Sequence, residues 1–493
     1  MRIVVLHPAA ESDSPFASYS PPYEPALYAP EHDWSSRTIR KALAHRQVAE
    51  LARDEPDVVV NLCDGAEDED RPGIEVVRAL ERFGLAYTGA TEHVYDPSRL
   101  AMKMACQSVG VSFPAFATAQ SRDDAPAIAH GLSFPMLVKH PRSYSSVGLT
   151  EASRVSSVDE LAERLGAMCA QYGGALVEEF IAGREFTVLV AEGLREGDPP
   201  RTWPTAEFEL GGPLAFKHFE LKWKSYESMV TRLVADASLD ERLRADAAGC
   251  FEALGATGYG RCDFRMGEDG VPKLLELNPN CAVFYPPGQH GSADLILARS
   301  PGGHRAFLEH ILAVALRRRK SRRRSWRIGY TPSLGFGLFT TRALRAGDRL
   351  VRYEGSAFHL VSRGHLEREW SGRRRELMAR YGWPVAPDLL ATWSPDPEEW
   401  RPINHSCEPN SWFDGLDIVA RFDLAEGDEI TVDYATFCGR DMQPFPCECG
   451  SALCRKLVTG ADLDEPLLAA RYAGHIFSGA WRGAGRSSTE AAE

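Results

Sequence analysis

The chain has 493 residues, of which 44% are hydrophobic and 25% charged, a composition typical of globular proteins with ample cores. This length predicts roughly two to four domains. The net charge of −13 disfavours nucleic acid or an anionic membrane as principal partner, and no apolar run reaches the ~18 residues that span a bilayer.

The first hundred residues predict an α/β subdomain. Apolar β-branched runs at 3–6 and 58–62 are each followed by loop residues and then by helical patterns, which is typical of a parallel sheet. The first run turns acidic and proline-rich too soon for a secretory signal. The eleven cysteines are scattered, except for four that gather with metal-ligand spacing. We therefore expect a reducing, cytoplasmic compartment.

The stretch 135–148 is the first with recognisable chemistry. An apolar strand pattern ends at Lys139, and a loop of small residues that contains Ser145 and Ser146 follows it. Such loops direct backbone amides and hydroxyls at phosphate, and a lysine neutralises the phosphate charge. A plain surface loop has the same composition, so the prediction of a phosphate site depends on the residues that follow.

Three oxygen ligands follow later in the same half. Asp263, Glu276 and Asn278 lie on two apolar strand patterns joined by a turn at 268–270. The spacing of two residues places Glu276 and Asn278 on one face of a strand. Because Mg²⁺ takes carboxylates together with phosphate oxygens, these residues predict a magnesium site opposite the phosphate loop. A pair of satisfied polar residues on an edge strand is the alternative.

Residues 1 to about 316 resemble the ATP-grasp superfamily, most of all the D-alanine–D-alanine ligases. Ligases of this kind use ATP and Mg²⁺ to convert a carboxylate into an acyl phosphate, which an amine then attacks. The segments that carry the resemblance are Tyr87–Gly89, Lys103 with Gly110, Lys139–Gly148, Glu178–Thr187, Phe219–Trp223, Arg261–Asp263 and Glu276–Asn278.

The resemblance implies a role for most matched residues. Lys139 and Arg99 would hold phosphates, the segment 178–181 would line the adenine, and Glu185 would take the ribose. The residues assigned in this way to the nucleotide are Arg99, Lys139, Ser145, Ser146, Glu178, Glu179, Ile181, Glu185 and Lys222.

The same resemblance assigns the chemistry of the reacting groups. Asp263, Glu276 and Asn278 would bind magnesium. Arg261 would meet the oxygens of the acyl phosphate and of the tetrahedral intermediate, as a fixed cation where negative charge develops.

Several positions depart from the D-alanine ligase pattern. The segment 8–12 replaces a glycine-rich segment, Arg99 stands where a lysine is usual, and Tyr144 fills a glycine position of the phosphate loop. The stretch 281–288 differs where the second substrate would lie. We expect ATP use to survive these changes, but not the use of D-alanine.

A basic run at 317–324 divides the chain. It follows an apolar helical pattern and precedes a glycine-rich strand pattern. Blocks of like charge stay solvated, so we interpret it as an interdomain linker, with a nucleic-acid patch as the alternative. The expected parts are a ligase-like domain at 1–316 (subdomains 1–110 and 111–316), the linker 317–324, a domain at 325–440, a cysteine motif at 441–460 and a tail at 461–493.

The second half begins with a predicted β-hairpin. The segment 334–339 followed by 343–355 has the pattern of two strands, in which Gly335 and Gly337 let a ligand approach the backbone. The polar segment 400–410, interrupted by two prolines, predicts a constrained turn. Strand patterns follow at 416–422 and 428–432.

The cysteines at 447, 449 and 454 predict a zinc site. These three thiols lie within eight positions, and structural zinc takes four ligands in a tetrahedron. Cys407 is the natural fourth ligand, and His405 is the alternative.

These stretches resemble SET-domain methyltransferases with a cysteine-rich post-SET tail, over residues 325 to about 460. The matching segments are Gly335–Gly337, Arg401–Asn410, Glu426–Tyr434 and Cys447–Arg455, with Pro402 in place of a common aromatic residue. The resemblance implies that S-adenosylmethionine binds Gly335, Phe336, Gly337, Asn404 and His405. Tyr434 would be the catalytic tyrosine where a lysine-type amine meets the methyl group, and zinc held by Cys407, Cys447, Cys449 and Cys454 would be structural.

The insert between residues 355 and 400 shows no family pattern, yet substrate choice would be made there. We interpret its basic run, 373–375, as solvated helix surface. The tail from 463 predicts one helical patch, and its last dozen residues predict disorder.

The expected fold is an α/β ATP-grasp domain, with α+β subdomains around a nucleotide cleft, followed by a mostly-β SET domain with a post-SET zinc knot. We therefore expect a bifunctional enzyme that uses ATP, Mg²⁺ and S-adenosylmethionine. Three hypotheses stay open. In the first, the enzyme is a protein-lysine methyltransferase with a second, ligase activity. In the second, it is a peptide or small-molecule tailoring enzyme whose ligation product is methylated. In the third, one half has become a binding module.

Overall fold

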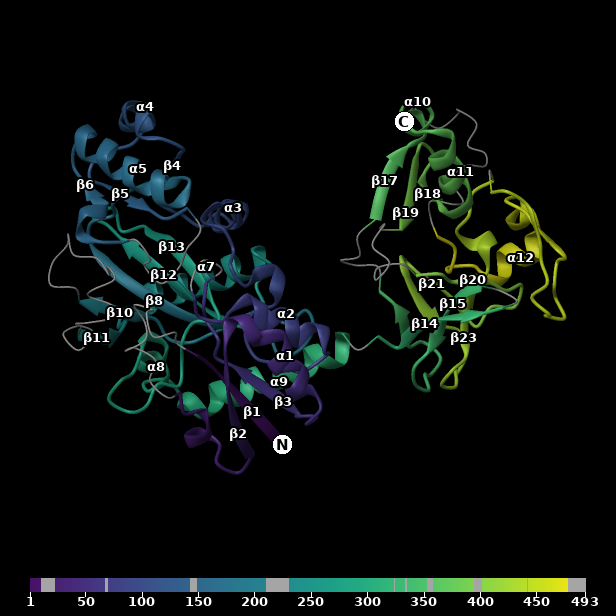
Figure 1. Cartoon of the computed structure of the whole chain (residues 1–493), viewed down its shortest axis with the longest axis horizontal. Helices are drawn as coiled ribbons and strands as arrows, with labels where there is room; N and C mark the ends of the chain where they lie inside the picture. The colour runs from purple at the N-terminus through teal and green to yellow at the C-terminus, as the bar shows by residue number, and fades with distance from the viewer. Residues whose placement is uncertain are drawn as a thin grey trace. The chain divides into compact units, whose positions relative to one another are not determined.

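The computed structural model divides the chain into two compact units, Met1–Arg322 and Arg323–Glu493 (Figure 1). It describes residues 1–9, 23–66, 70–141, 149–209, 230–322, 324–332, 335–352, 358–393, 401–440 and 442–477. Ser145, Ser146 and Lys222, and the tail expected to be disordered, lie outside these ranges. Within them, no helix combines the length and the apolar character that crossing a membrane requires.

The first unit opens with a parallel sheet in the order β2-β1-β3, as the runs at 3–6 and 58–62 predict. Alternate residues of β1 face opposite sides: Val4 and Leu6 pack against α1 and α2, whereas Ile3 and Val5 belong to the core that contains α9. The elements are β1 (Arg2–Pro8), β2 (Asp33–Ile39), α1 (Ala44–Ala52), β3 (Val58–Asn61) and α2 (Ile74–Arg82).

An antiparallel sheet in the order β4-β7-β5-β6 follows, and α4 and α5 bury its apolar face. It carries Lys139 at the end of β5 and Glu178 on the neighbouring β7, so that both expected nucleotide residues lie on adjacent strands. The elements are α3 (Arg99–Val109), β4 (Phe116–Ala119), α4 (Ala125–Gly131), β5 (Met136–Lys139), β6 (Arg154–Val155), α5 (Val158–Tyr172) and β7 (Ala175–Glu179).

A larger antiparallel sheet, β11-β10-β8-β12-β13 with β9 beside β8, completes the first unit. Residues of α3 and α7 share a core with one face of it, and α8 and α9 share a core with the other. The elements are β8 (Arg184–Ala191), β9 (Arg201–Thr202), β10 (Ala206–Glu209), β11 (Val230–Leu233), α7 (Ala237–Ala253), β12 (Tyr259–Met266), β13 (Pro272–Pro279), α8 (Ser292–Leu297) and α9 (Gly303–Arg322).

The basic run differs from the solvated linker that its charge predicts. α9 continues through Arg322, six residues into the run. Arg318 is buried and donates to the carbonyl oxygens of Tyr87 (2.8 Å) and Gly89 (2.9 Å), and Arg317 pairs with Glu192. Because these guanidinium groups have partners within the first unit, the start of the run belongs to that unit rather than to a linker.

The second unit has a core between two small sheets, β14-β15-β23-β20 and β16-β22-β21. The predicted hairpin was placed wrongly: β15 pairs with the preceding β14 and with β23, whereas β16 pairs with β22 in the other sheet. The bridge Leu344↔Leu424 holds the turn between them. The elements are β14 (Trp326–Thr331), β15 (Gly335–Thr340), β16 (Arg349–Val351), β20 (Asn404–His405), β21 (Ser411–Asp414), β22 (Asp417–Ala420) and β23 (Glu429–Val432).

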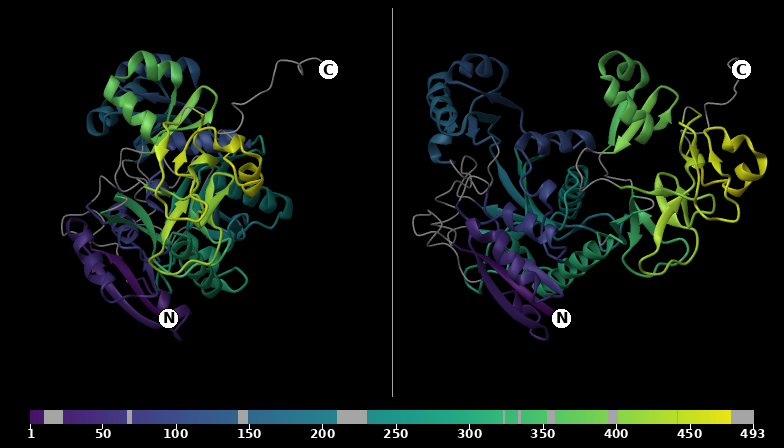
Figure 2. Two further views of the ribbon diagram at one scale, coloured as in Figure 1. Left: turned by 90° about the vertical axis from the view of Figure 1, so that its right-hand side faces the viewer. Right: turned by 45° about the vertical axis from the view of Figure 1, so that its right-hand side comes forward.

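The insert forms a lobe of the second unit, green in Figure 2, with the sheet β17-β19-β18 and two helices. The run 373–375 lies on α11, a helix as expected. The elements are β17 (Phe358–Ser362), α10 (Arg363–Glu369), α11 (Gly372–Tyr381), β18 (Trp383–Ala386) and β19 (Leu389–Trp393). After the insert and the central sheets come β24 (Phe445–Pro446), β25 (Leu457–Val458) and the predicted tail helix α12 (Pro466–Arg471).

Two candidate active sites

A buried cluster of two lysines and one carboxylate lies in the first unit. Glu178 is 2% exposed, and its two oxygens each lie 2.5 Å from a lysine Nζ, one from Lys103 on α3 and one from Lys139 on β5. Burial alone would raise the pKa of Glu178, but Lys139 and Lys103 outweigh it and lower that pKa to about 2. The carboxylate is therefore ionised at neutral pH and fixes both ammonium groups.

Arg99 connects this cluster to the carboxylates of β13. It is 7% exposed at the start of α3, where Ser98 caps the helix. Its Nη1 lies 3.0 Å from Glu276 Oε2, and its Nε donates to the carbonyl of His140, directly after β5 (3.1 Å). The guanidinium thus lies between the strand that ends in Lys139 and a predicted magnesium ligand.

The predicted magnesium ligands meet at the pairing of β12 with β13. Asp263 lies opposite Glu276, and Arg261 opposite Asn278, in the strand register. Asn278 Nδ2 donates to Asp263 Oδ2 (3.2 Å) and to Glu276 Oε1 (3.3 Å). Asp263 also accepts a hydrogen bond from Thr187 Oγ1 (2.8 Å). Three oxygen-bearing side chains on neighbouring strands therefore converge at one point.

Arg261 lies beside these groups and is paired with one of them. Its guanidinium makes a forked contact with the Asp263 carboxylate, with Nη2 2.8 Å from Oδ2 and Nε 3.0 Å from Oδ1. Burial by itself would lower the pKa of Arg261, but Asp263 outweighs it and raises that pKa. The cation is permanent and directed at the cluster.

The remaining residues expected at the nucleotide lie around the turn between β7 and β8. Glu185 is 4% exposed and lies 3.8 Å from the buried Arg265. Glu179 accepts a hydrogen bond from the backbone amide of Ser133 (2.7 Å), and Ile181 is half-buried. Glu185 and the segment 178–181 are therefore close in the fold, although Glu178 and Glu179 already have protein partners.

In the second unit, β20 and β15 meet at the glycine motif. Asn404 Nδ2 donates to the carbonyl of Phe336 (3.2 Å) and to Glu429 Oε1 (2.6 Å). A Cβ at Gly337 would lie 2.5 Å from that Glu429 oxygen and 3.0 Å from Asn404 Nδ2, and Gly335 has φ +77°. The left-handed backbone favours glycine at Gly335, and at Gly337 a side chain would displace the ends of Glu429 and Asn404.

His405 and Tyr434 lie side by side, with ring centroids 5.3 Å apart. Burial lowers the pKa of His405 to about 4. The nearby Asp433 acts to raise this pKa, and Arg455 acts to lower it further. The ring is therefore neutral at pH 7. Its Nδ1 accepts the backbone N–H of Tyr434 (3.1 Å), so the ring proton resides on Nε2, 3.3 Å from Cys407 Sγ.

Tyr434 is held by both its backbone and its hydroxyl. The Oη donates to the carbonyl of Ile403 (2.8 Å). Burial raises the pKa of Tyr434 above its ordinary value, so the phenol stays protonated at neutral pH. Phe437 packs edge-to-face against the ring at 5.4 Å. The hydroxyl oxygen thus has a fixed position and keeps acceptor capacity.

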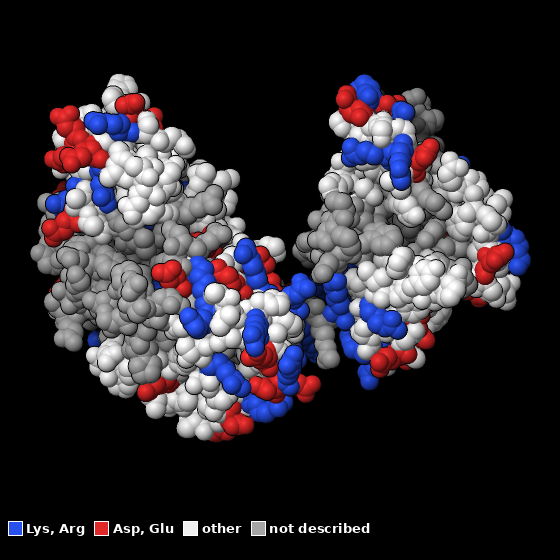
Figure 3. All heavy atoms as spheres, viewed as in Figure 1, with Lys and Arg blue, Asp and Glu red and all other residues white. Residues whose placement is uncertain are grey.

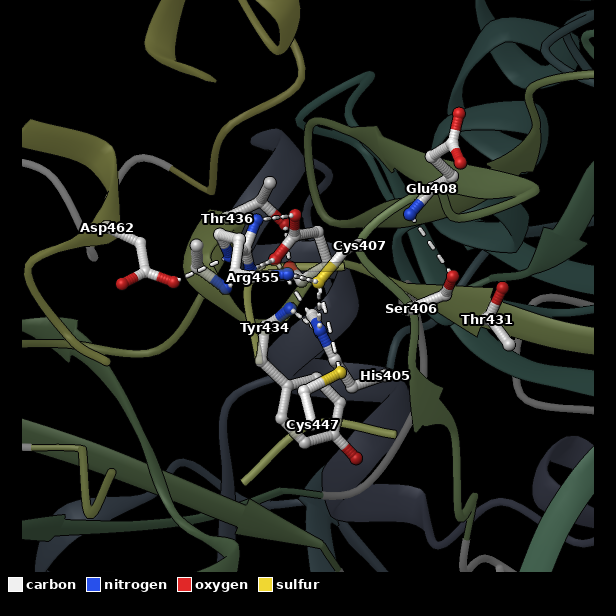
Figure 4. A network of polar contacts seen from close by, with 12 residues as sticks. His405, Ser406, Cys407, Glu408, Thr431, Tyr434, Thr436, Cys447, Arg455 and Asp462 are labelled. Atoms are coloured by element: carbon white, nitrogen blue, oxygen red, sulfur yellow. Dashed lines mark hydrogen bonds and ion pairs between the residues drawn. The ribbon is translucent and has the colours of Figure 1, made fainter. Parts of the chain in front are cut away.

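The residue before Tyr434 ties the cysteine-rich tail to the site. Asp433 is 1% exposed and accepts from Arg455 Nη1 (2.7 Å), from Arg455 Nη2 (2.6 Å) and from Tyr472 Oη (3.0 Å). The Arg455 backbone N–H faces Cys407 Sγ at 3.4 Å, and its Nε lies 2.8 Å from Asp462 (Figure 4). One arginine therefore joins the tail, the cysteines and the strand that carries Tyr434.

Four thiols gather where sequence spacing predicts them. The Sγ atoms of Cys407, Cys447, Cys449 and Cys454 all lie within 4.8 Å of one another. Those of Cys407 and Cys447 are 3.9 Å apart, and none of these cysteines forms a disulfide. A tetrahedral zinc site with Zn–S bonds of about 2.3 Å has sulfurs about 3.8 Å apart. The Cys407–Cys447 pair matches this spacing, and the other pairs lie within about 1 Å of it.

Several contact residues lie in the matched segments but received no role from the sequence. Lys103 lies four positions after Arg99 on one helix face, a spacing that could have identified it. Thr187, Glu429 and Arg455 act through contacts with residues distant in the chain. No local pattern identifies such partners.

Two family models match the chain. One is described as D-ala D-ala ligase C-terminus and matches residues 106–283, and the other is the SET domain and matches residues 335–435. The D-alanine–D-alanine ligase of Janthinobacterium sp. (strain Marseille) is 32% identical over 247 residues, which cover 48% of this chain and 72% of that protein. The ligase of Herminiimonas arsenicoxydans is 31% identical over 250 residues, which cover 48% of this chain and 70% of that protein.

Solved structures of D-alanine–D-alanine ligases are also similar. The enzyme from Bacillus anthracis complexed with ATP has a TM-score of 0.46 at 19% identity, covering 65% of this chain and 99% of that one. The enzyme from Coxiella burnetii has a TM-score of 0.48 at 15% identity, covering 65% and 95%. On the sequence matches, the chain belongs to the D-alanine–D-alanine ligase family in its first unit and carries a SET domain in its second.

Proposed function

We propose that this chain is a bifunctional enzyme, an ATP-dependent carboxylate–amine ligase joined to an S-adenosylmethionine-dependent amine methyltransferase. The observation that carries the proposal is that each unit has its own reactive cluster. The first contains Asp263, Glu276 and Asn278 beside Arg261. The second contains Tyr434 beside His405, and the neighbouring Asn404 contacts the glycine motif.

In the ligase half, positive side chains hold the phosphates of ATP. Arg99 contacts Glu276 of the β12–β13 cluster and the carbonyl of His140, the residue after Lys139. Lys139 and Lys103 share the counterion Glu178. The γ-phosphoryl group passes to a substrate carboxylate, ADP leaves, and an amine attacks the carbonyl carbon to expel phosphate. Arg261 stabilises the negative charge that develops on the acyl oxygens.

The oxygen cluster fits magnesium. Mg²⁺ prefers carboxylates together with phosphate oxygens, and the two carboxylates of Asp263 and Glu276 converge on Asn278. Turning the Asn278 amide by half a rotation presents its oxygen instead of its nitrogen, and the two are distinguished only by hydrogen-bond partners. Bound there, Mg²⁺ would neutralise the phosphate charge during transfer.

In the methyltransferase half, the chain aligns an amine with the methyl group. Gly335, Phe336, Gly337, Asn404 and His405 would hold S-adenosylmethionine, and the close approach at Gly337 supports a cofactor lying against the backbone. The acceptor amine must be neutral and in line with the methyl group. The fixed Tyr434 hydroxyl oxygen can accept its N–H and orient its lone pair.

The four cysteines would bind structural zinc, which anchors the tail. Their sulfur spacing supports a closed tetrahedral site without an open position for catalysis. The site would also hold Arg455, the residue after Cys454, in contact with Asp433.

The acceptor that we propose is a lysine-type amine of a protein or peptide. The departures at 8–12 and 281–288 support ligase substrates other than D-alanine. Only part of the first of these segments is described in the structure.

Thermal unfolding of the full chain with each ligand tests the proposal. MgATP should raise the unfolding temperature of one unit and S-adenosylhomocysteine that of the other. At a hundred times its dissociation constant, each ligand adds about 2.7 kcal/mol to the free energy of unfolding. Asp263→Asn should remove only the first response. If neither ligand shifts its transition, both activities are refuted. A response to one ligand alone supports only the activity of the unit that binds it.

A further inference from the structure

Helix α11 of the insert exposes two large apolar side chains to solvent. It is anchored by the buried Met378, 4% exposed, while Leu377 and Tyr381 are 53% and 48% exposed. The described residues of the helix on either side of Met378 are all exposed. Half-exposed large apolar side chains on a short helix mark a candidate interaction surface.

The exposed residues form one stripe along α11. Arg373, Leu377 and Tyr381 recur at intervals of four, which places them on one face of the helix. Arg374 borders the stripe and lies over the Trp370 ring at 4.1 Å. Glu376 lies about 100° around the helix from Leu377. The stripe thus has a basic end, Arg373 with Arg374, and an apolar end, Leu377 with Tyr381.

Figure 3 shows basic side chains, with acidic ones among them, at the end of the second unit that α10 and α11 form. The sequence of α11 contains Arg373, Arg374 and Arg375 near its beginning and Glu376 as its acidic residue. Within the described part of the chain, no hydrogen bond or ion pair is made by the Arg373 guanidinium. Positive charge is therefore available at the basic end.

Two ring contacts connect the segment after the apolar end of the stripe to Tyr434. Trp383, two residues after Tyr381, packs edge-to-face on Phe437 at 6.5 Å, and Phe437 packs on Tyr434 at 5.4 Å. A Cβ on Gly439 would lie 2.8 Å from Pro384, so β18 and the segment after Tyr434 are in close contact. At 1.5 Å per residue, Arg373 lies about 12 Å along the helix from Tyr381.

We propose that this stripe binds the methyl acceptor, and that the acceptor is an extended peptide with an acidic residue about four to seven positions from its target lysine. The inference rests on the proposed methyl transfer at Tyr434. An extended chain advances about 3.3 Å per residue, so the helix from Arg373 to Tyr381 corresponds to about four residues. The ring contacts of 6.5 Å and 5.4 Å between Trp383 and Tyr434 extend this span to at most about seven residues. Arg373 and Arg374 complement the acidic residue, and Leu377 with Tyr381 complements apolar side chains between.

A preference for an acidic peptide is opposite to what the net charge of the whole chain predicts. With a net charge of −13, the protein attracts basic partners over long distances. A preference for an acidic peptide must then come from a local surface. Nucleic acid is a poorer occupant, since the apolar half of the stripe gives its backbone no partner.

Three synthetic peptides test the proposal on the full-length protein. Each has fifteen residues and one central lysine, and they differ only by Glu, Gln or Arg at the fourth and seventh positions on either side of it. Binding is followed by fluorescence anisotropy with S-adenosylhomocysteine present, and transfer with labelled S-adenosylmethionine. We expect the Glu peptide to bind about tenfold better than the Gln peptide, or about 1.4 kcal/mol. This advantage should shrink at high salt.

Charge reversal supplies the matched comparison. The double variant Arg373→Glu/Arg374→Glu should bind the Arg peptide best. Arg342→Glu/Arg345→Glu makes the same charge change on the exposed turn after β15 and should keep the preference for the Glu peptide. Both changes are on the surface, so the melting transitions should stay unchanged.

Other outcomes overturn the proposal. Equal binding of the three peptides, or an unchanged order in Arg373→Glu/Arg374→Glu, refutes the stripe as the acceptor site. Stripe-dependent binding of a short RNA or of anionic phospholipid vesicles, or self-association that this double variant abolishes, assigns the face to another partner. Calorimetry of S-adenosylhomocysteine on the same sample separates the claims, because absent binding refutes the methyltransferase and intact binding without peptide preference refutes only the stripe.

Discussion

Replacing Glu178 by glutamine should destabilise the first unit strongly. The carboxylate is 2% exposed and is the shared counterion of Lys103 and Lys139, which are 4% and 6% exposed. Glu178→Gln leaves the two buried ammonium groups without their negatively charged partner. Breaking a buried ion pair from one side costs about 3–5 kcal/mol.

The pH dependence of this loss follows from the shifted pKa. The pKa of Glu178 is lowered from 4.5 to about 2 by its lysines against the effect of burial, which corresponds to about 3 kcal/mol. A lowered carboxyl pKa stabilises the fold above pH 4.5, and this contribution is lost as pH falls toward 2. Glu178→Gln should lack that acid-sensitive contribution. Burial also lowers the pKa of Lys103, so the cost of the variant should shrink at alkaline pH.

Calorimetric unfolding of the full chain between pH 3 and 10 measures this effect, in the transition that MgATP raises. Glu50→Gln is the matched control, because Glu50 is 55% exposed and pairs with Arg46. An exposed helix pair contributes only about 0.3–0.5 kcal/mol. A loss below about 1 kcal/mol for Glu178→Gln, or one that is independent of pH, would refute the reasoning.

Three further predictions concern the second unit. Cys449→Ser should remove one equivalent of zinc, as measured by mass spectrometry of the metal. It should also lower the melting temperature of the second unit and leave that of the ATP-responsive unit unchanged. Full retention of the metal would contradict the proposed zinc site. Gly337→Ala should weaken S-adenosylhomocysteine binding about tenfold in calorimetry, since the added Cβ would displace Glu429 and with it Asn404, a proposed cofactor ligand. Unchanged affinity would contradict a role for this contact. Arg455→Gln should cost about 3 kcal/mol in urea unfolding, because the buried Asp433 loses its cationic partner and keeps only hydrogen bonds such as that from Tyr472. A loss below about 1 kcal/mol would show that the pair contributes little.

Local patterns predicted the strands that carry chemistry. The parallel runs at 3–6 and 58–62, the strand ending in Lys139 and the strand pair of Asp263 and Asn278 were all correct. Alternating or β-branched apolar residues report on a strand directly, because a strand buries its faces locally. Thiol spacing also predicted that Cys447, Cys449 and Cys454 lie together, with Cys407 as the fourth member. Cys407 does join them, from 40 residues before Cys447.

Contacts between distant segments could not be predicted in this way. The basic run at 317–324 has the composition of a linker, yet Arg318 is buried against two carbonyls of a loop more than 200 residues earlier. The hairpin expected at 334–355 was wrong because its two strands join different sheets. In both cases the outcome depends on partners that the local sequence does not contain.

One labelling experiment tests the central claim that a single chain ligates and methylates. Purified protein is incubated with labelled S-adenosylmethionine and a cell extract, with and without ATP, and Tyr434→Phe serves as the control. Label should enter protein bands or small molecules with the wild type and be lost with Tyr434→Phe, and ATP should be consumed in a reaction that Asp263→Asn abolishes. Label that persists in Tyr434→Phe, or ATP consumption that persists in Asp263→Asn, would contradict the account.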